Sequence, residues 1–305
     1  MLAISRTPPF SHFQDAAGNA TFHINTTVVG LELVAGGGEK PPKLNINWTR
    51  PKEPRQSVEQ TKQFILLAIL AHVVDSFDVL LRDYADLDWL GLESLRELLG
   101  KSATKPGGKG YSISERTEAV LDNLGIAERD ALSLLALGVA WRNSLAHTGR
   151  ARQKIPDGVA DYLTAAASRL SDRYAAIDIE AMLVRFSKGD RPTLKDATTL
   201  VAASQNLARA LDEALIRRVA GTTEQLLKIV RSSLARAFKE DEAQWKRVWG
   251  RDPAARARAL LHFVAQLGIT ETSHPVSAAL ESGEIGRIAL VSQSRIATAD
   301  FSGVA

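Results

Sequence analysis

The sequence predicts a mainly α-helical fold, and two observations support that class. From Ser57 onward, apolar residues recur with a helical period along most of the chain. Residue pairs that match the helix-capping box stand just before several of these periodic stretches. The chain has 305 residues, of which 45% are hydrophobic and 24% charged, so it can bury a sizeable core as a soluble globular protein.

The N-terminal segment, residues 1–54, is predicted to depart from this helical pattern. Residues 1–20 show no regular period. Residues 21–34 are rich in Thr, Val and Ile, which favours a β-strand, and residues 43–49 alternate between apolar and polar side chains. A stretch rich in Gly and Pro lies between the two. We therefore expect a small N-terminal β-hairpin with a long loop.

The central segment, residues 55–175, is predicted to form an antiparallel helical bundle. Ser57 with Gln60 and Ser112 with Glu115 form the capping pattern that starts a helix, and Gly125 is typical of a helix end. The expected helices cover 58–84, 89–99, 112–125, 127–146 and 156–175. The first and fourth of them are apolar almost all round over much of their length, which predicts that other helices bury them.

The C-terminal segment, residues 176–305, is predicted to be a helical extension of the bundle. Thr193 with Asp196 and Thr222 with Gln225 form further capping patterns, and Asp252 precedes a proline at a first helical position. The expected helices cover 193–219, 222–238 and 253–267. A strand over Gly286–Ser292 is expected before a loose tail.

Composition narrows the possible cofactors and the location. The chain has no Cys, which excludes disulfides, thiolate nucleophiles and Cys-based zinc or iron–sulfur centres. We expect no cofactor and no metal. The longest apolar run, Phe64–Ala71, is shorter than the roughly 18 residues of a membrane span. Met1–Gln14 lacks the apolar run of a signal peptide. The expected location is the cytoplasm, without a membrane partner.

Chemically informative residues gather near the end of the predicted helix at 127–146. Arg142 and Asn143 are followed by His147, where a short turn can bring the Arg and the His onto one surface. No acidic residue occurs from Trp141 to Ile155. The same stretch holds three further cations, namely Arg150, Arg152 and Lys154. Such a local positive field attracts a phosphate backbone.

This motif resembles the signature of the HEPN superfamily of small α-helical bundles. Arg142-Asn143-x3-His147 matches the family's Arg-Asn-x3-His pattern and lies, as in the family, at the end of a core helix. The segment 66–84 resembles the family's first long helix, in which an acidic residue often stands two positions before an aromatic one. Asp75 has that place here. The resemblance covers residues 55–175 and is closest to HEPN families of bacterial toxin and phage-defence loci.

The resemblance implies metal-independent RNA cleavage by a homodimer whose two motifs face one cleft. RNA carries its own nucleophile, the 2′-OH, so the protein must supply a base and a charge stabiliser. His147 is expected to act as general acid/base and Arg142 to stabilise the phosphate. Asn143 would orient one of them, and Asp75 would fix Arg142. The expected RNA-binding residues are Arg150, Arg152 and Lys154. An antitoxin or a sensor protein is an expected partner.

Other interpretations of these residues compete with the endoribonuclease. Cations near a helix C-terminus are favoured by the helix dipole alone, and Asp75 suits an ordinary salt bridge. A non-catalytic HEPN-like module could serve for helical dimerisation or nucleic-acid binding. A helical nucleic-acid-binding regulator could use residues 205–258, where 12 basic residues face 7 acidic ones. The joint presence of Arg142, Asn143 and His147 favours the enzyme.

Overall fold

A computed structural model describes residues 1–49, 51–87, 89, 93–100, 108, 110–146 and 154–297, and this part of the chain is mainly helical, as predicted. The helices are α1 (Pro8–Ala35), α2 (Pro54–Ala85), α3 (Glu93–Leu99), α4 (Ile113–Leu124), α5 (Arg129–Ala146), α6 (Val159–Ala165), α7 (Ala167–Arg173), α8 (Ile179–Lys188), α9 (Leu194–Ala220), α10 (Thr223–Glu240), α11 (Glu242–Trp249), α12 (Pro253–Gln266), α13 (Ser282–Ala289) and α14 (Gln293–Ala297). The strands β1 (Leu2–Ile4) and β2 (Ile269–Glu271) pair antiparallel.

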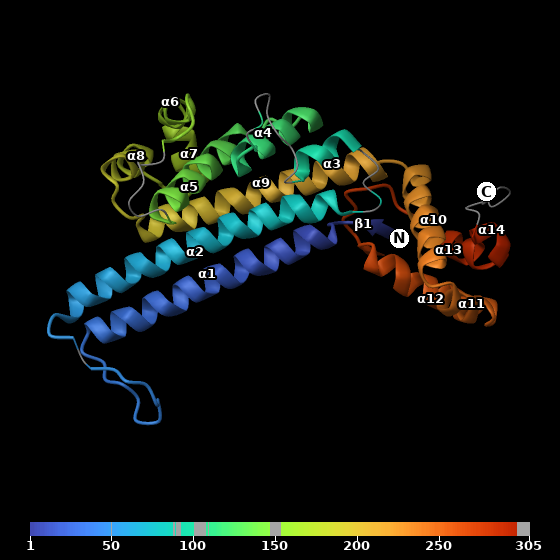
Figure 1. Ribbon diagram of the computed structural model, residues 1–305, viewed down its shortest axis with the longest axis horizontal. Coiled ribbons are helices and arrows are strands. Elements are labelled where there is room, and N and C mark those ends of the chain that lie inside the picture. Colours follow the sequence, from blue (N-terminus) through green and yellow to red (C-terminus); the bar gives the residue numbers. More distant parts are fainter. Residues whose placement is uncertain are drawn as a thin grey trace.

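The helices form an elongated bundle with a second body at one end. Helices α1 and α2 make a long antiparallel hairpin, and α9 runs beside both of them. Helix α5 lies across α2 and α9, with α4, α6 and α8 around it (Figure 1). Helices α10 to α14 and the two strands gather at the end of the bundle that is remote from the loop between α1 and α2.

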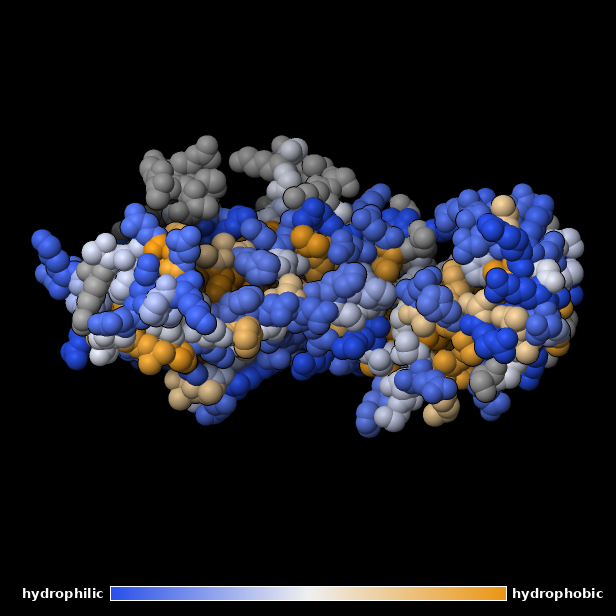
Figure 2. Space-filling model, turned by 90° about the horizontal axis from the view of Figure 1, so that it is seen from below, coloured by the Kyte–Doolittle hydropathy of each residue, from blue (hydrophilic) through white to orange (hydrophobic). Residues whose placement is uncertain are grey.

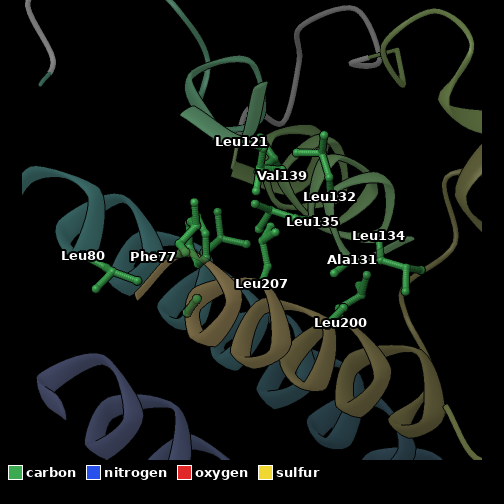
Figure 3. Close-up of a cluster of buried hydrophobic side chains, with 14 of the residues drawn as sticks. Phe77, Leu80, Leu121, Ala131, Leu132, Leu134, Leu135, Val139, Leu200 and Leu207 are labelled. Atoms are coloured by element: carbon green, nitrogen blue, oxygen red, sulfur yellow. The ribbon is translucent and has the colours of Figure 1, made fainter. Parts of the chain in front are cut away.

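The first core fills the space between α2, α5 and α9. Phe77 of α2, Leu135 of α5 and Leu207 of α9 are each at most 1% exposed and point toward one another (Figure 3). Phe13 of α1 meets Phe77 edge to face at 5.7 Å between ring centroids, which is a favoured arrangement of two aromatic rings. This core takes residues from all three predicted segments, so the boundaries after residues 54 and 175 do not separate cores.

The second core joins the two ends of the chain. Leu2 and Ile4 of β1 are buried against β2 and the C-terminal helices. Around them, Trp245 and Trp249 of α11 pack with Phe238 of α10. Helix α9 contributes side chains to both cores, so it is the element that connects the bundle to the second body.

The predicted N-terminal β-hairpin is wrong. Residues 21–34 belong to helix α1, and residues 43–49 form no strand. Thr7 caps α1 by accepting a hydrogen bond from the Phe10 amide at 3.2 Å, and Pro8 follows at the first helical position. Along α1 the buried positions Phe10, Phe13, Ala17, Ala20 and Ile24 have helical spacing. Packing of this face on α2 outweighs the weak strand preference of the Thr–Val run.

The expected strand over Gly286–Ser292 is also wrong, because most of it lies in helix α13. Glu281 and Glu284 form a capping box before this helix. Ile285, Ile288 and Ala289 are buried at a spacing of three to four residues, which is the helical period. The short apolar run therefore belongs to a buried helix, a case that periodicity over so few residues cannot separate from a strand.

Several helix boundaries follow the predicted signals. Ser112 with Glu115, Thr193 with Asp196, and Thr222 with Gln225 form reciprocal capping boxes, and Asp252 caps α12. Gly125 ends α4 with a left-handed φ of 68°, which suits glycine. The expected start at Ser57 is wrong, since α2 begins at Pro54. The segment 156–175 is divided into two short helices, α6 and α7.

A buried polar cluster ties α1, α2 and α9 together where the bundle meets the second body. Asp212 of α9 accepts hydrogen bonds from the Thr7 amide at 3.1 Å, from Thr7 Oγ1 at 2.5 Å and from Tyr84 Oη at 2.9 Å. Burial raises the pKa of the Asp212 carboxyl to about 6, although these donors oppose the effect. Burial also raises the pKa of Tyr84, and the charge of Asp212 adds to it.

We expect Asp212 to make the free energy of unfolding fall as pH rises from about 4 to about 6. In this window the folded protein holds a proton on Asp212 that the unfolded chain has released, so deprotonation favours unfolding. The loss is about 3 kcal/mol. Urea denaturation of the protein and of Asp212→Asn across this range should show the stability difference between them shrinking with rising pH. A difference that does not vary with pH would contradict the expectation.

Among the described residues, one helix, α2, is long and apolar enough to cross a membrane by length and composition. Core helices of soluble proteins meet the same criterion. Helix α2 packs against α1, α3, α5 and α9, but only 39% of its most apolar stretch is buried, so packing in the bundle explains part of its apolar composition.

The outer face of α1 also presents apolar side chains to solvent, among them Phe22, Val29 and Leu33. On the face shown in Figure 2, apolar residues gather near the end of the bundle that holds the loop between α1 and α2, and over the second body.

Candidate functional site

The site residues stand where helix α5 leaves the core. From Ala131 to Trp141 every residue of α5 is buried, because α2, α4, α6 and α9 surround the helix. At Gly138 an added Cβ would lie 3.6 Å from Leu70 of α2 and 3.7 Å from Leu200 of α9, so the helices approach closely there. Arg142 is the first residue beyond this buried stretch, and its guanidinium reaches the surface from a rigid support.

The structure brings Asp75, Arg142 and Asn143 together. The Nη2 atom of Arg142 donates to Oδ1 of Asp75 on α2 at 2.5 Å. Its Nη1 atom donates to Oδ1 of the neighbouring Asn143 at 2.9 Å. One carboxylate and one amide oxygen therefore fix the plane of the guanidinium from two sides. This is the contact that the sequence predicted between the two helices.

The pair is accessible to solvent. The Asp75 side chain is 54% exposed and the Arg142 side chain 31% exposed. At such exposure an ion pair contributes at most about 1 kcal/mol to stability. Its main physical effect is thus orientation of the cation. A guanidinium has five N–H donors, so Arg142 can hold Asp75 and Asn143 and also bind a phosphate oxygen.

Three of the predicted site residues, His147, Arg150 and Arg152, lie outside the described residues. Lys154 is described and exposed, and it lines a cavity together with Trp141 and Ser144 of α5. The described part of the basic stretch is therefore adjacent in space to the end of α5.

Sequence reasoning missed the support that α8 gives to this region. Trp141 Nε1 donates to the backbone oxygen of Asp190 at 3.0 Å. The ring of Phe186 meets the indole of Trp141 edge to face at 5.8 Å between centroids. These partners lie more than 40 residues further along the chain than Trp141. No local pattern in the sequence could have indicated them.

The outer face of α2 runs past the Asp75–Arg142 pair. It carries Phe64, Ala68, His72, Asp75 and Val79, all exposed and spaced by three or four residues. Phe64 is 64% and Val79 42% exposed. His72 is exposed on this face and is not packed into the core. This outer face is apolar apart from His72 and Asp75.

In the part of the chain that the structure describes, no group of three or more His, Cys, Asp or Glu side chains stands close enough together to hold a metal ion. The chemistry that the described site offers is that of a fixed guanidinium beside a carboxylate and an amide.

Comparisons with models of protein families, with curated proteins and with solved structures find no match for this chain.

Proposed function

We propose that the protein is a metal-independent endoribonuclease of HEPN type that acts as a toxin or an anti-phage, abortive-infection effector. The observation that carries the proposal is the fixed guanidinium of Arg142, held by Asp75 and Asn143 at the end of the core helix α5. This arrangement supports the resemblance, because the Arg and the Asn of the motif contact each other and His147 follows four residues after Asn143 in the sequence.

The proposed reaction uses the 2′-OH of the RNA as nucleophile. His147 removes the 2′-OH proton, and the oxygen attacks the adjacent phosphorus. The P–O5′ bond breaks, and the leaving 5′ oxygen takes up a proton. Arg142 donates hydrogen bonds to the phosphate oxygens as negative charge builds on them. The products are a 2′,3′-cyclic phosphate and a 5′-OH end. Asp75 and Asn143 position Arg142, and Arg150, Arg152 and Lys154 attract the RNA backbone.

The decisive experiment is an RNA cleavage assay with purified protein in the presence of EDTA. The proposal expects cleavage, with 2′,3′-cyclic phosphate and 5′-OH ends on the fragments. Loss of cleavage on chelation, or fragments with 5′-phosphate ends, would exclude this mechanism. Expression of the intact protein in a bacterium should also slow growth unless an antitoxin is present. Normal growth with abundant active protein would favour a scaffold over a toxin.

We further propose that two copies of the chain pair through the outer face of α2 to complete the site. An exposed apolar stripe that contains Phe64 and Val79 runs past Asp75, and a partner helix would remove it from water. Pairing there would place the Arg142 groups of both protomers beside one cleft.

Val79→Glu is expected to convert the dimer to a monomer and to lower the cleavage rate. The substitution puts a charge at the end of the proposed contact, one turn from Asp75. Light scattering after size-exclusion chromatography measures the mass. Leu261→Glu is the matched control, because Leu261 is also an exposed aliphatic residue, 39% accessible, but lies on α12 in the second body. Equal masses for the two variants would refute pairing through this face.

Asp75→Ala is expected to lower the cleavage rate by about 10- to 100-fold, because an unfixed guanidinium is misplaced relative to the phosphate. Asp75→Asn keeps an oxygen that can accept from Arg142 and should recover part of the rate. Glu59→Ala, also an exposed acid on α2, serves as control. Stability should change by less than about 1 kcal/mol in each case. Wild-type cleavage kinetics in Asp75→Ala would show that Asp75 does not position Arg142 for cleavage.

The alternative is a non-catalytic helical module for dimerisation or nucleic-acid binding. The exposed apolar face of α2 is the observation that favours it, since a scaffold needs that surface but no general base. Protein that dimerises and binds RNA in the assay above without cleaving it would support the module.

A further inference from the structure

A cavity of about 620 Å³ opens beside the end of α5, between this helix, α6 and α8. Its walls are mainly apolar, with Trp141 from α5, Ala160 from α6 and Val184 and Phe186 from α8. Cavities of about 300–1,000 Å³ with apolar walls and a few polar groups are typical of small-molecule sites. The cavity is therefore large enough for one planar ring system with its sugar.

The walls of this cavity are held in place by specific contacts. Trp141 is 1% exposed, and its Nε1 atom donates to the Asp190 backbone oxygen in the turn after α8. Phe186 packs edge to face on the same indole, with an angle of 88° between the rings. The hydrogen bond and the ring contact keep α8 at a fixed distance from α5, so the cavity is formed before any ligand enters it.

The polar groups of the cavity are few and differ in charge. Three residues with polar side chains are among those that line it, namely Lys154 and Asp190, both exposed, and Ser144 of α5. The Ser144 hydroxyl donates to the Ala140 backbone oxygen at 2.9 Å, so its oxygen can accept from a ligand. A ligand that is flat and apolar on its faces and polar at its edge suits this lining.

The cavity and the candidate site meet at the same turn of α5, although Arg142, Asn143 and Asp75 do not line the cavity. Trp141 and Ser144 immediately precede and follow the Arg142–Asn143 pair, and positions three apart share one side of a helix. Arg142 itself reaches from the same turn to Asp75 on α2. An RNA strand with a phosphate on Arg142 can thus place a neighbouring base in the cavity, with Lys154 close to its backbone.

We propose that this cavity binds one unstacked nucleobase of the RNA substrate next to the scissile phosphate and thereby sets the sequence preference of cleavage. The inference rests on the proposed function. The ring lies against Val184 and Phe186, and the Asp190 carboxylate accepts a hydrogen bond from an exocyclic amino group. Adenine, cytosine and guanine carry such a group, whereas uracil has the O4 carbonyl oxygen where cytosine has its amino group. The Asp190 carboxylate repels that oxygen, so the cavity selects against uracil.

The experiment maps the 5′-OH ends that the protein produces from an RNA of randomised sequence. The wild type should prefer an amino-bearing base over uracil about tenfold at one position beside the cut. Ala160→Phe fills the cavity and should abolish the preference. Ala165→Phe is the matched control, because Ala165 is an exposed alanine at the end of the same helix, and it should behave as wild type.

If Ala160→Phe fails to fold, two further measurements test base binding in the cavity. Asp190→Ala, at an exposed position, should lose the discrimination against uracil while it still cleaves. Saturation-transfer NMR with AMP, CMP and UMP should show contact between the base of AMP or CMP and the wild-type protein, and weaker contact with Asp190→Ala.

The outcomes separate failure of the cavity from failure of the enzyme. Two results would contradict base binding in the cavity but leave the proposed ribonuclease function standing. One is cleavage that depends on Arg142 but shows no base preference. The other is a base preference that is unchanged in both Ala160→Phe and Asp190→Ala. Binding of AMP and CMP without RNA cleavage would contradict the proposed ribonuclease function but support base binding in the cavity. Absence of AMP and CMP binding to the wild type would contradict base binding in the cavity.

Discussion

Arg142→Ala and His147→Ala are each expected to lower the rate of RNA cleavage by about 10²–10⁴-fold while the fold stays intact. Without His147 the 2′-OH has no positioned base. Without Arg142 the charge that builds on the phosphate loses its strongest donor. The fold should survive because Arg142 is accessible and its ion pair with Asp75 is exposed.

Arg142→Lys separates charge from geometry at the same position. A lysine keeps the positive charge but offers a single ammonium in place of a planar fork of donors. It cannot hold Asp75 and Asn143 and also present two parallel hydrogen bonds to a phosphate. We therefore expect Arg142→Lys to remain close to Arg142→Ala in rate. Near wild-type activity in the lysine variant would show that charge alone suffices.

The measurement is single-turnover cleavage of a labelled RNA, with circular dichroism and thermal melting as checks of the fold. Arg258→Ala is the control, because Arg258 is an exposed arginine on α12 in the basic stretch 205–258. It should keep the wild-type rate. If Arg258→Ala loses activity and Arg142→Ala keeps it, the C-terminal basic stretch is the functional surface and the motif is not.

The fold could be predicted from the sequence where the signals are local. The boxes at Ser112, Thr193 and Thr222 mark helix starts because the partners are three residues apart. Helix α1 has the local signals of a helix, namely Thr7, two prolines and a helical apolar face, but it also contains a Thr–Val run that favours a strand. Packing of this segment on α2 stabilises the helix rather than the strand, and no local sequence pattern describes that packing.

The candidate site divides in the same way. Arg142 and Asn143 are neighbours in the sequence and match part of a known motif. The resemblance predicts that Asp75 on another helix contacts Arg142, and the structure shows this hydrogen bond. Other hydrogen bonds join residues that are far apart in the sequence. Trp141 and Asp190 are 49 positions apart. Asp212 is 205 positions from Thr7 and 128 from Tyr84. Such contacts depend on how the helices are arranged, so they become visible only in three dimensions.

The largest stability effect is expected at Arg116, where Arg116→Met should lower the free energy of unfolding by about 3–5 kcal/mol. Arg116 is 3% exposed on α4 and forms an ion pair with Asp78 of α2. Its Nη1 atom also donates to the backbone oxygen of Leu99, the last residue of α3, at 2.8 Å. Methionine removes the cation and leaves a buried carboxylate and a carbonyl without this donor. Urea denaturation measures the loss.

Two comparisons test whether burial of the charge is the cause. Arg129→Met breaks the exposed pair with Glu118, whose atoms lie 3.9 Å apart, and should cost less than about 1 kcal/mol. Asp78→Leu combined with Arg116→Met removes both charges and should recover much of the loss, because the cost arises from a buried carboxylate that has lost its buried cation and keeps the longer contact with Arg82 at 3.4 Å. A double variant no more stable than Arg116→Met would show that packing and the Leu99 hydrogen bond, rather than the ion pair with Asp78, account for the contribution of Arg116 to stability.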